Sequence, residues 1–242
     1  MKFSILTLFP EFFECLYNYS IIGRAIEEGK IQLESINIRD FSENKHGQVD
    51  DYSYGGGPGM VMQPGPIYRS IESVKGENSK VIYLSPQGNV LTQKKLNELS
   101  KLDHIVLLNG HYEGIDNRII ENYIDEEISL GDFVLTGGEI ATMALIDGVT
   151  RLLPGVLSSE ESYESESHYN GILEFPQYTR PRIFNGFEVP EVLLSGDHKK
   201  IEEYRKYQAI RVTLEKRPDL IDRSKLSDLE LKYLNDILHE GR

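Results

Sequence analysis

Four glycine-containing stretches carry the residue types best suited to holding a ligand against bare backbone. The first reads DDYSYGGGPGMVM from Asp50 to Met62, and glycine fills four of the five positions from Gly55 to Gly59. The other three are LSPQG (84–88), NGHYEGID (109–116) and SLGDFVLTGGE (129–139). Glycine lets a ligand approach the backbone closely, where N–H and C=O groups can hydrogen-bond to it. These stretches therefore predict ligand-binding loops.

The glycine spacing excludes the common phosphate-binding motifs. Met60 stands where the third glycine of G-x-G-x-x-G would follow Gly55 and Gly57, which argues against a dinucleotide oxidoreductase. The nearest approach to a P-loop, Gly23 to Ile31, has the wrong spacing and lacks the hydroxyl residue. The six histidines show no H-x-x-x-H spacing, so we expect no structural zinc site and assign no metal ligand.

The loops follow an alternation of strand-like and helix-like segments over the first 150 residues. We expect strands at 2–9, 31–38, 81–85 and 104–109, and helices that begin at Pro10, near Ile67, after the Thr92 cap and at Asp116. This βαβα order is typical of an α/β domain with a mostly parallel sheet and helices on both faces. Ligands of such domains bind at the carboxyl ends of the strands.

Composition indicates a globular chain without a membrane span. Of 242 residues, 39% are hydrophobic and 27% charged, and no run approaches the roughly 18 apolar residues of a transmembrane helix. The start MKFSILTLFPEFFE lacks a small-residue cleavage site, and the single cysteine, Cys15, suits a reducing compartment. We expect a cytoplasmic protein.

The last third of the chain differs from the rest in charge. Residues 157–170 are polar and acidic like a linker, and beyond them Asp197 and the Ser227–Glu230 capping box each precede a helical pattern. The segment from Tyr178 to Arg217 contains nine basic and six acidic residues, so its net charge is +3 in a chain whose net charge is −13. This segment suits either a localised polyanion partner or a solvated helix face.

Seven ordered blocks resemble a known family: LFPEFF, DDYSYGGGPGM, VIYLSPQG, LNGHYEGIDNR, ISLGDFVLTGGE, RLLPGVL and FPQYTRP. In this order and spacing they are similar to the bacterial tRNA (guanine-N1)-methyltransferases that modify guanosine 37 beside the anticodon, within the knotted SPOUT methyltransferases. The resemblance implies an α/β SPOUT domain (1–157) with a deep trefoil knot near its C-terminal end, a flexible linker (158–170) and a small helical tRNA-binding domain (171–242). It also implies a homodimer.

The resemblance further implies S-adenosylmethionine as the cofactor, held in the knot. The matching positions are Tyr83, Leu84, Ser85, Pro86, Gly110, Tyr112, Glu113, Gly114, Leu130, Gly131, Asp132, Phe133, Val134, Leu135, Gly137 and Gly138. Three positions depart from the family pattern: Phe133 replaces a frequent tyrosine, His111 a frequent arginine and Ser53 the usual proline.

Methylation at N1 of guanine requires a base, because that nitrogen carries a proton at neutral pH, and a cation near O6, where negative charge develops. The family's arginine matches Arg151, and its aspartate base matches Glu166, with Glu164 as the competing candidate. Glutamate keeps the carboxylate but adds a methylene group. A non-catalytic tRNA-binding protein and a SPOUT RNA 2'-O-methyltransferase remain the alternatives.

The resemblance also implies that the protein recognises a G that precedes the target G in the tRNA. Positions near that dinucleotide match Asp50, Gly55, Gly59 and Ser162, while the basic residues Arg180, Lys199, Lys200 and Arg205 are candidates for gripping the anticodon stem through phosphate contacts. Magnesium dependence is also implied for the family, and Glu113 is the ligand we would suggest for it.

Overall fold

The computed structural model describes residues 1–18, 20–157 and 166–240. It contains two compact units, Met1–Ser158 and Ser159–Arg242. Ser162 and Glu164, both proposed site residues, lie outside the described residues.

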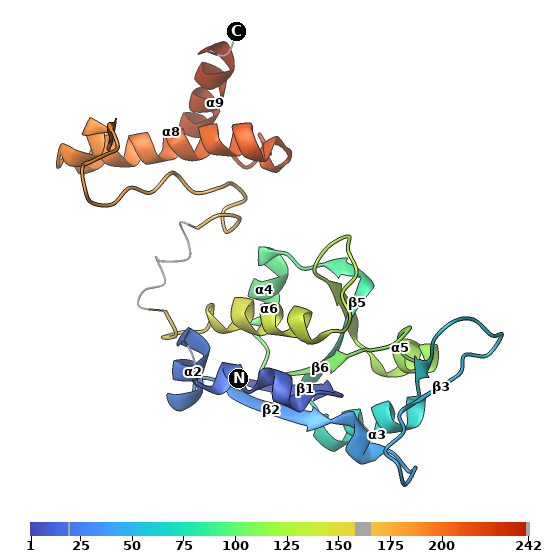
Figure 1. Ribbon diagram of the computed structural model, residues 1–242. Helices are drawn as coiled ribbons and strands as arrows, with labels where there is room; N and C mark the ends of the chain where they lie inside the picture. Colours follow the sequence, from blue (N-terminus) through green and yellow to red (C-terminus); the bar gives the residue numbers. More distant parts are fainter. Residues whose placement is uncertain (19, 158–165, 241–242) are drawn as a thin grey trace. The chain divides into compact units, whose positions relative to one another are not determined.

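The first unit is built on a sheet of five described strands (Figure 1). They are β1 (Lys2–Thr7), β2 (Gln32–Asn37), β5 (Ser79–Val90), β6 (His104–Asn109) and β7 (Glu126–Ser129), in the order β2-β1-β6-β5-β7. All four neighbouring pairs are parallel, which confirms the predicted parallel sheet. Strand β7 was not predicted, because its sequence EEIS is short and lacks a strand-like alternation.

Helices cover both faces of this sheet, as the alternation predicted. One face packs against η1 (Pro10–Phe13), α1 (Cys15–Asn18), α2 (Ser20–Glu27), α4 (Gln93–Leu99) and α6 (Glu139–Thr150). The other packs against η2 (Ile38–Phe41), α3 (Pro64–Val74) and α5 (Asn117–Tyr123). Successive strand residues enter opposite cores, as a period of two requires: Ile82 and Leu84 the first, Val81 and Tyr83 the second. The alternation thus places Tyr83 on the α3–α5 side.

Strand β5 makes an excursion where it passes β7. Leu84 and Asn89 both pair with Ile128, so residues 85–88 bulge out of the ladder. Gly88 lies against the backbone of Glu127 and Ile128, where an added Cβ would stand 2.5 Å from Ile128 N. The LSPQG loop is therefore the bulge itself, and its glycine permits the close approach.

A short antiparallel pair, β3 (Asp50–Asp51) and β4 (Val61–Met62), closes the base of the glycine loop. The loop between them has positive φ at Gly55 (87°), Gly56 (80°), Gly57 (131°) and Gly59 (78°). L-residues with a side chain rarely adopt such angles, which explains the concentration of glycine.

The second unit contains two described α-helices, α8 (His198–Lys216) and α9 (Asp228–Glu240). Asp197 Oδ1 accepts a hydrogen bond from Lys200 N at 3.2 Å, and Ser227 and Glu230 bond reciprocally, so both predicted caps are confirmed. The unit also has η3 (Glu191–Leu194), η4 (Pro218–Leu220) and a hairpin of β8 (Ile183–Phe184) and β9 (Phe187–Glu188). Leu173 N donates to Thr213 Oγ1 at 2.9 Å, which ties the entering segment to α8.

Among the described residues, none of the helices combines the length and apolar character needed to cross a bilayer.

We expect Gly88→Ala to lower the free energy of unfolding by about 1–3 kcal/mol, the usual effect of overpacking a filled site. Gly76→Ala is the matched control, because nothing lies within 4 Å of a Cβ at Gly76. Urea unfolding followed by circular dichroism measures both. Equal stability of the two variants would show that the bulge tolerates a side chain.

Candidate functional site

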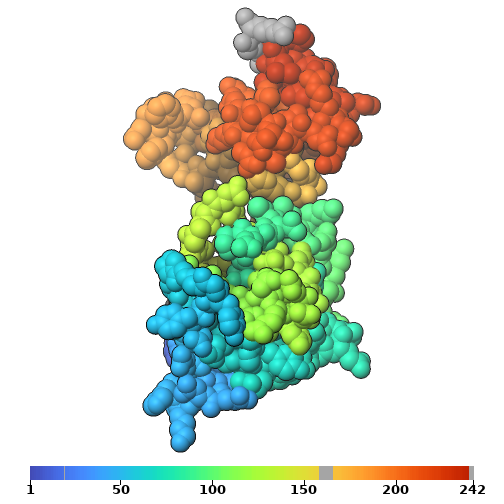
Figure 2. Space-filling view, turned by 90° about the vertical axis from the view of Figure 1, so that its right-hand side faces the viewer, coloured from blue at the N-terminus to red at the C-terminus, as the bar shows by residue number. Residues whose placement is uncertain are grey.

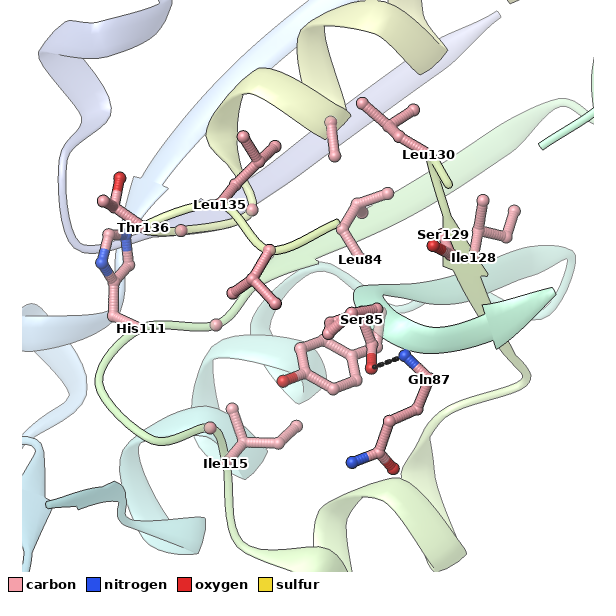
Figure 3. A pocket seen from close by; sticks show the side chains of 18 of the residues that line it. Leu84, Ser85, Gln87, His111, Ile115, Ile128, Ser129, Leu130, Leu135 and Thr136 are labelled. Carbon is pink, nitrogen blue, oxygen red and sulfur yellow. Dashed lines mark hydrogen bonds between the residues drawn. The ribbon is translucent and has the colours of Figure 1, made fainter. Parts of the chain in front are cut away.

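A cavity of about 370 Å³ opens at the carboxyl ends of β5, β6 and β7 (Figure 3). Its walls are the β5 excursion, the loop 110–115 after β6 and the loop 130–138 between β7 and α6. These are three of the four loops that the glycine pattern singled out. The structure thus gathers segments from distant parts of the chain at the sheet edge predicted to bind a ligand.

The predicted cofactor residues occur together around this cavity. All of them line it except Gly131 and Asp132, which lie in the same loop but outside the lining. The lining also contains residues that the sequence did not indicate: Gln87, His111, Ile115, Asn117, Ile120, Ile128, Ser129, Thr136 and Ala141. Most of these are neighbours of predicted positions in the chain. Ile120 and Ala141 lie one turn into their helices and carried no sequence signal.

Tyr83 forms part of the cavity wall next to Gly110. A Cβ at Gly110 would lie 2.7 Å from the Tyr83 hydroxyl, so the glycine lets the phenol ring pack against the backbone. Burial, followed by the nearby charge of Glu127, raises the pKa of Tyr83 to about 12. The phenol is therefore neutral at physiological pH and keeps its proton for donation.

Short hydrogen-bonded turns fix the shape of two walls. Gln87 N donates to Ser85 Oγ at 3.2 Å within the β5 excursion (Figure 3). Gly131 N donates to Ser129 Oγ at 3.1 Å at the start of the loop 130–138. Leu84, Leu130 and Leu135 add apolar surface. This combination of apolar side chains and a few fixed polar groups is typical of sites for small molecules and cofactors.

The buried carboxylate of Glu139 lies directly behind the cavity, at the first residue of α6. His111 Nε2 lies 2.8 Å and 2.9 Å from its two oxygens, and Thr7 Oγ1 donates to Oε1 at 2.7 Å. Burial favours the neutral acid, but the hydrogen bonds from His111 and Thr7 outweigh it and lower the pKa of Glu139. The sequence reasoning missed this residue, although it directly follows the Gly137–Gly138 pair.

The two proposed catalytic residues belong to different units, and Arg151 is not part of the cavity wall. Arg151 is the C-cap of α6, whose 12 residues span about 18 Å from the cavity end. Glu166 belongs to the second unit, where its carbonyl accepts a hydrogen bond from Tyr169 N at 3.3 Å.

The first residues of the glycine loop, Tyr52 to Tyr54, line a second cavity of about 1180 Å³, whereas Gly55 to Gly59 do not. This cavity shares Ile115 and Asn117 with the first. In Figure 2 the loop, in blue, lies beside the segment around residue 118. Of the predicted RNA-binding positions, Asp50 is buried in β3, and a Cβ at Gly55 would meet nothing within 4 Å. Gly59 instead packs on Glu113, because a Cβ there would stand 2.5 Å from Glu113 Cγ. A side chain at Gly59 would therefore also disturb Glu113, which lines the first cavity.

In the second unit, Arg180 and Arg205 line one pocket of about 400 Å³ together with Arg182. The guanidinium of Arg205 lies 4.9 Å from the centre of the Phe175 ring, a cation–π distance. Within the described part of the chain, no acidic residue lines this pocket and no carboxylate pairs with the three arginines. Lys199 and Lys200 lie in the first turn of α8 and outside the lining.

The described residues contain no group of three His, Cys, Asp or Glu side chains that could hold a metal ion. Glu113 is therefore not part of such a group among the described residues.

A family model and several individual proteins that are similar to this chain all indicate the same family. A family model described as tRNA (Guanine-1)-methyltransferase TrmD matches residues 1–223. The tRNA (guanine-N(1)-)-methyltransferase of Ruminiclostridium cellulolyticum is 57% identical over 226 residues, 92% of this chain and 97% of that protein. The protein of the same name from Caldanaerobacter subterraneus subsp. tengcongensis is 54% identical over 98% of this chain and 98% of that protein. The protein of that name from Clostridium perfringens (strain 13) is also 54% identical, over 97% of this chain and 99% of that protein. The predicted family resemblance is confirmed.

We expect Gly110→Ala to weaken binding of S-adenosylmethionine about tenfold or more, because displacing the packed Tyr83 ring costs on the order of 1–3 kcal/mol. Isothermal titration calorimetry measures the dissociation constant. Gly76→Ala is the control, because nothing lies within 4 Å of a Cβ at Gly76. Unchanged affinity would place the cofactor elsewhere.

Proposed function

The chain belongs to the tRNA (guanine-1)-methyltransferase family, and on this premise we propose that it transfers a methyl group from S-adenosylmethionine to N1 of guanosine 37 in tRNAs with a preceding G. The observation that carries the proposal is the cavity at the sheet edge, which gathers three loops containing nearly all the positions matched to the family's cofactor contacts. S-adenosylmethionine supplies an electrophilic methyl group, and the protein's task is to orient the acceptor nitrogen.

Two groups of the chain would handle the charges of the reaction. Glu166 takes the N1 proton, and Arg151 stabilises the negative charge that develops toward O6. Arg151 does not line the cavity and Glu166 belongs to the other unit, so the reaction requires the RNA and these two residues to meet at the cavity. Glu164 is the alternative base, and its substitution separates it from Glu166.

The path of the chain supports a knot. The chain leaves the sheet at the edge strand β7 and returns to the middle, where Thr142 Oγ1 donates to Asn109 Oδ1 at 2.8 Å, at the end of β6. The loop 130–138 must therefore cross back past the end of β5, beside the excursion 85–88 and the loop 110–115. Threading of a chain through its own loop is rare in proteins, and the resemblance to the SPOUT methyltransferases is what implies it here.

Exposed apolar side chains support a homodimer. Phe9, Phe12, Phe133, Val134 and Ile140 are between 44% and 82% exposed, and all belong to segments around the cavity and the start of α6. Apolar clusters of this kind mark protein interfaces. A second copy would also account for the distance between the cavity and Arg151 within one chain, since it brings its own α6 end.

The tRNA would be gripped by the second unit. The arginine pocket of Arg180, Arg182 and Arg205 is a positively charged site in a chain of net charge −13, as a localised phosphate contact requires. Binding to tRNA agrees with the expected cytoplasmic location.

Mapping the methylated atom tests the proposed reaction directly. The purified chain is incubated with methyl-labelled S-adenosylmethionine and a tRNA transcript carrying G36 and G37, and the product is digested and analysed by mass spectrometry. We expect 1-methylguanosine at position 37. A 2'-O-methyl nucleotide would favour the other SPOUT chemistry, and binding without transfer would favour the non-catalytic alternative.

We expect Glu166→Gln to reduce turnover at least about 100-fold while cofactor affinity persists, the usual effect of losing a general base. Glu164→Gln is the matched control and should keep activity. Single-turnover methyl transfer at saturating cofactor measures both. The reverse pattern would assign the base to Glu164.

The double variant Arg180→Gln/Arg205→Gln should weaken tRNA binding and reduce the slope of log affinity against log salt by about 1–2, since each lost phosphate contact removes about one unit. Arg217→Gln is the control, because Arg217 already pairs with Asp219 at 2.6 Å. An unchanged slope for the double variant would move the RNA contact away from this pocket.

A further inference from the structure

A hydrogen-bond chain runs behind the cofactor cavity and joins four backbone segments. Phe9 N donates to Thr7 Oγ1 at 3.0 Å, and Thr7 Oγ1 donates to Glu139 Oε1 at 2.7 Å. His111 Nε2 approaches both oxygens of the same carboxylate. The linked segments are the end of β1, the residue before η1, the start of α6 and the loop after β6.

The direction of every bond in the chain is determined. An ionised carboxylate only accepts, so the Thr7 hydroxyl must donate to Glu139, and its lone pair remains for the N–H of Phe9. The same reasoning requires a hydrogen on His111 Nε2. Each group thus has a specific partner, and removing one leaves a buried polar atom without its bond. The penalty is large because Glu139 is only 5% exposed.

The chain holds two cavity walls against each other. His111 belongs to the loop 110–115, and Glu139 ends the loop 130–138. Gly137 is enclosed between them, since a Cβ there would stand 2.5 Å from Glu139 Oε2 and also collide with the His111 ring. Phe9 adds an edge-on ring contact to His111 at 4.9 Å. In Figure 3 His111 and Thr136 lie side by side at the rim where these two loops meet.

We propose that Thr7, Glu139 and His111 are positioning residues that hold the two loops in the arrangement competent to bind the cofactor. The inference rests on the proposed function, because it takes S-adenosylmethionine as the ligand of the cavity. Without the hydrogen-bond chain the loops would populate other arrangements, and the apparent dissociation constant would rise by the inverse of the competent fraction. Thr7 acts through Glu139 and touches no ligand, since it lies outside the cavity lining.

The test compares two buried hydroxyls on the same strand. Thr7→Val removes the hydroxyl at constant shape, and Thr7→Ser restores it. Ser4→Ala is the matched control, because Ser4 is also fully buried in β1 and bonds to a histidine, His104 Nε2 at 2.9 Å, but at the end of the sheet away from the cavity. Calorimetry gives the dissociation constant of S-adenosylmethionine, thermal unfolding gives stability, and methyl transfer gives KM for tRNA.

We expect Thr7→Val to raise the cofactor dissociation constant about tenfold, as the loss of one hydrogen bond to a charged group predicts. Thr7→Ser should recover wild-type affinity, Ser4→Ala should lower the melting temperature without changing cofactor affinity, and KM for tRNA should stay unchanged in all three. The proposal is overturned if Thr7→Val binds the cofactor as Ser4→Ala does, or if Thr7→Ser is as impaired as Thr7→Val.

Two further measurements keep the outcomes distinct. If Thr7→Val does not fold, His111→Ala and His111→Gln replace the pair, because glutamine retains a donor for Glu139; equal affinities for these two would overturn the proposal. If the wild-type chain itself does not bind S-adenosylmethionine, both the proposed function and the positioning role are overturned, whereas binding by the wild type with equal affinities in the paired variants overturns the positioning role alone.

Discussion

The seating of α6 on the ends of β1 and β6 is the contact on which the rest of the site depends. Thr142 donates to Asn109 Oδ1, and Asn109 Nδ2 donates to Leu6 O at 3.0 Å, both within the buried core. These bonds fix where α6 begins, and its first residue fixes where the loop 130–138 ends. Because that loop forms one wall of the cavity, the shape of the cavity depends on the seating of the helix.

The parallel sheet could be predicted from the sequence because its signals are local. The alternation of apolar residues and the caps at Thr92 and Asp197 report backbone conformation within a few residues, and the structure has them where expected. Glycine-rich loops could likewise be assigned to strand ends. Strand β7 was not predicted because Glu126, Glu127 and Ser129 give no apolar run. Its pairing with β5 depends on contacts that are distant in sequence.

The residues of the site likewise differ in whether they lie in continuous motifs of the sequence or are brought together only by the fold. The positions matched to the family's cofactor contacts lie in continuous motifs and nearly all line one cavity, whereas Thr7 and Glu139 are separated by 132 positions. Neither residue type at either position predicts a hydrogen bond, since only the fold brings them together. The glycine loop shows a similar limit: its glycines indicated backbone freedom, but the contact of Gly59 with Glu113 depends on how the loop folds over the cavity.

Charged side chains on the outermost strands have a consequence for how the protein can associate with itself. Glu126 of β7 is held by Lys80 at 2.6 Å and Lys95 at 2.8 Å, and Glu34 of β2 by Lys2 at 2.8 Å. Charges and short length on an edge strand oppose the addition of a further strand from another molecule. The charges therefore oppose growth of the sheet into larger β-assemblies at both edges, which leaves the helical and loop surfaces with exposed aromatic side chains as the places where a second copy would bind.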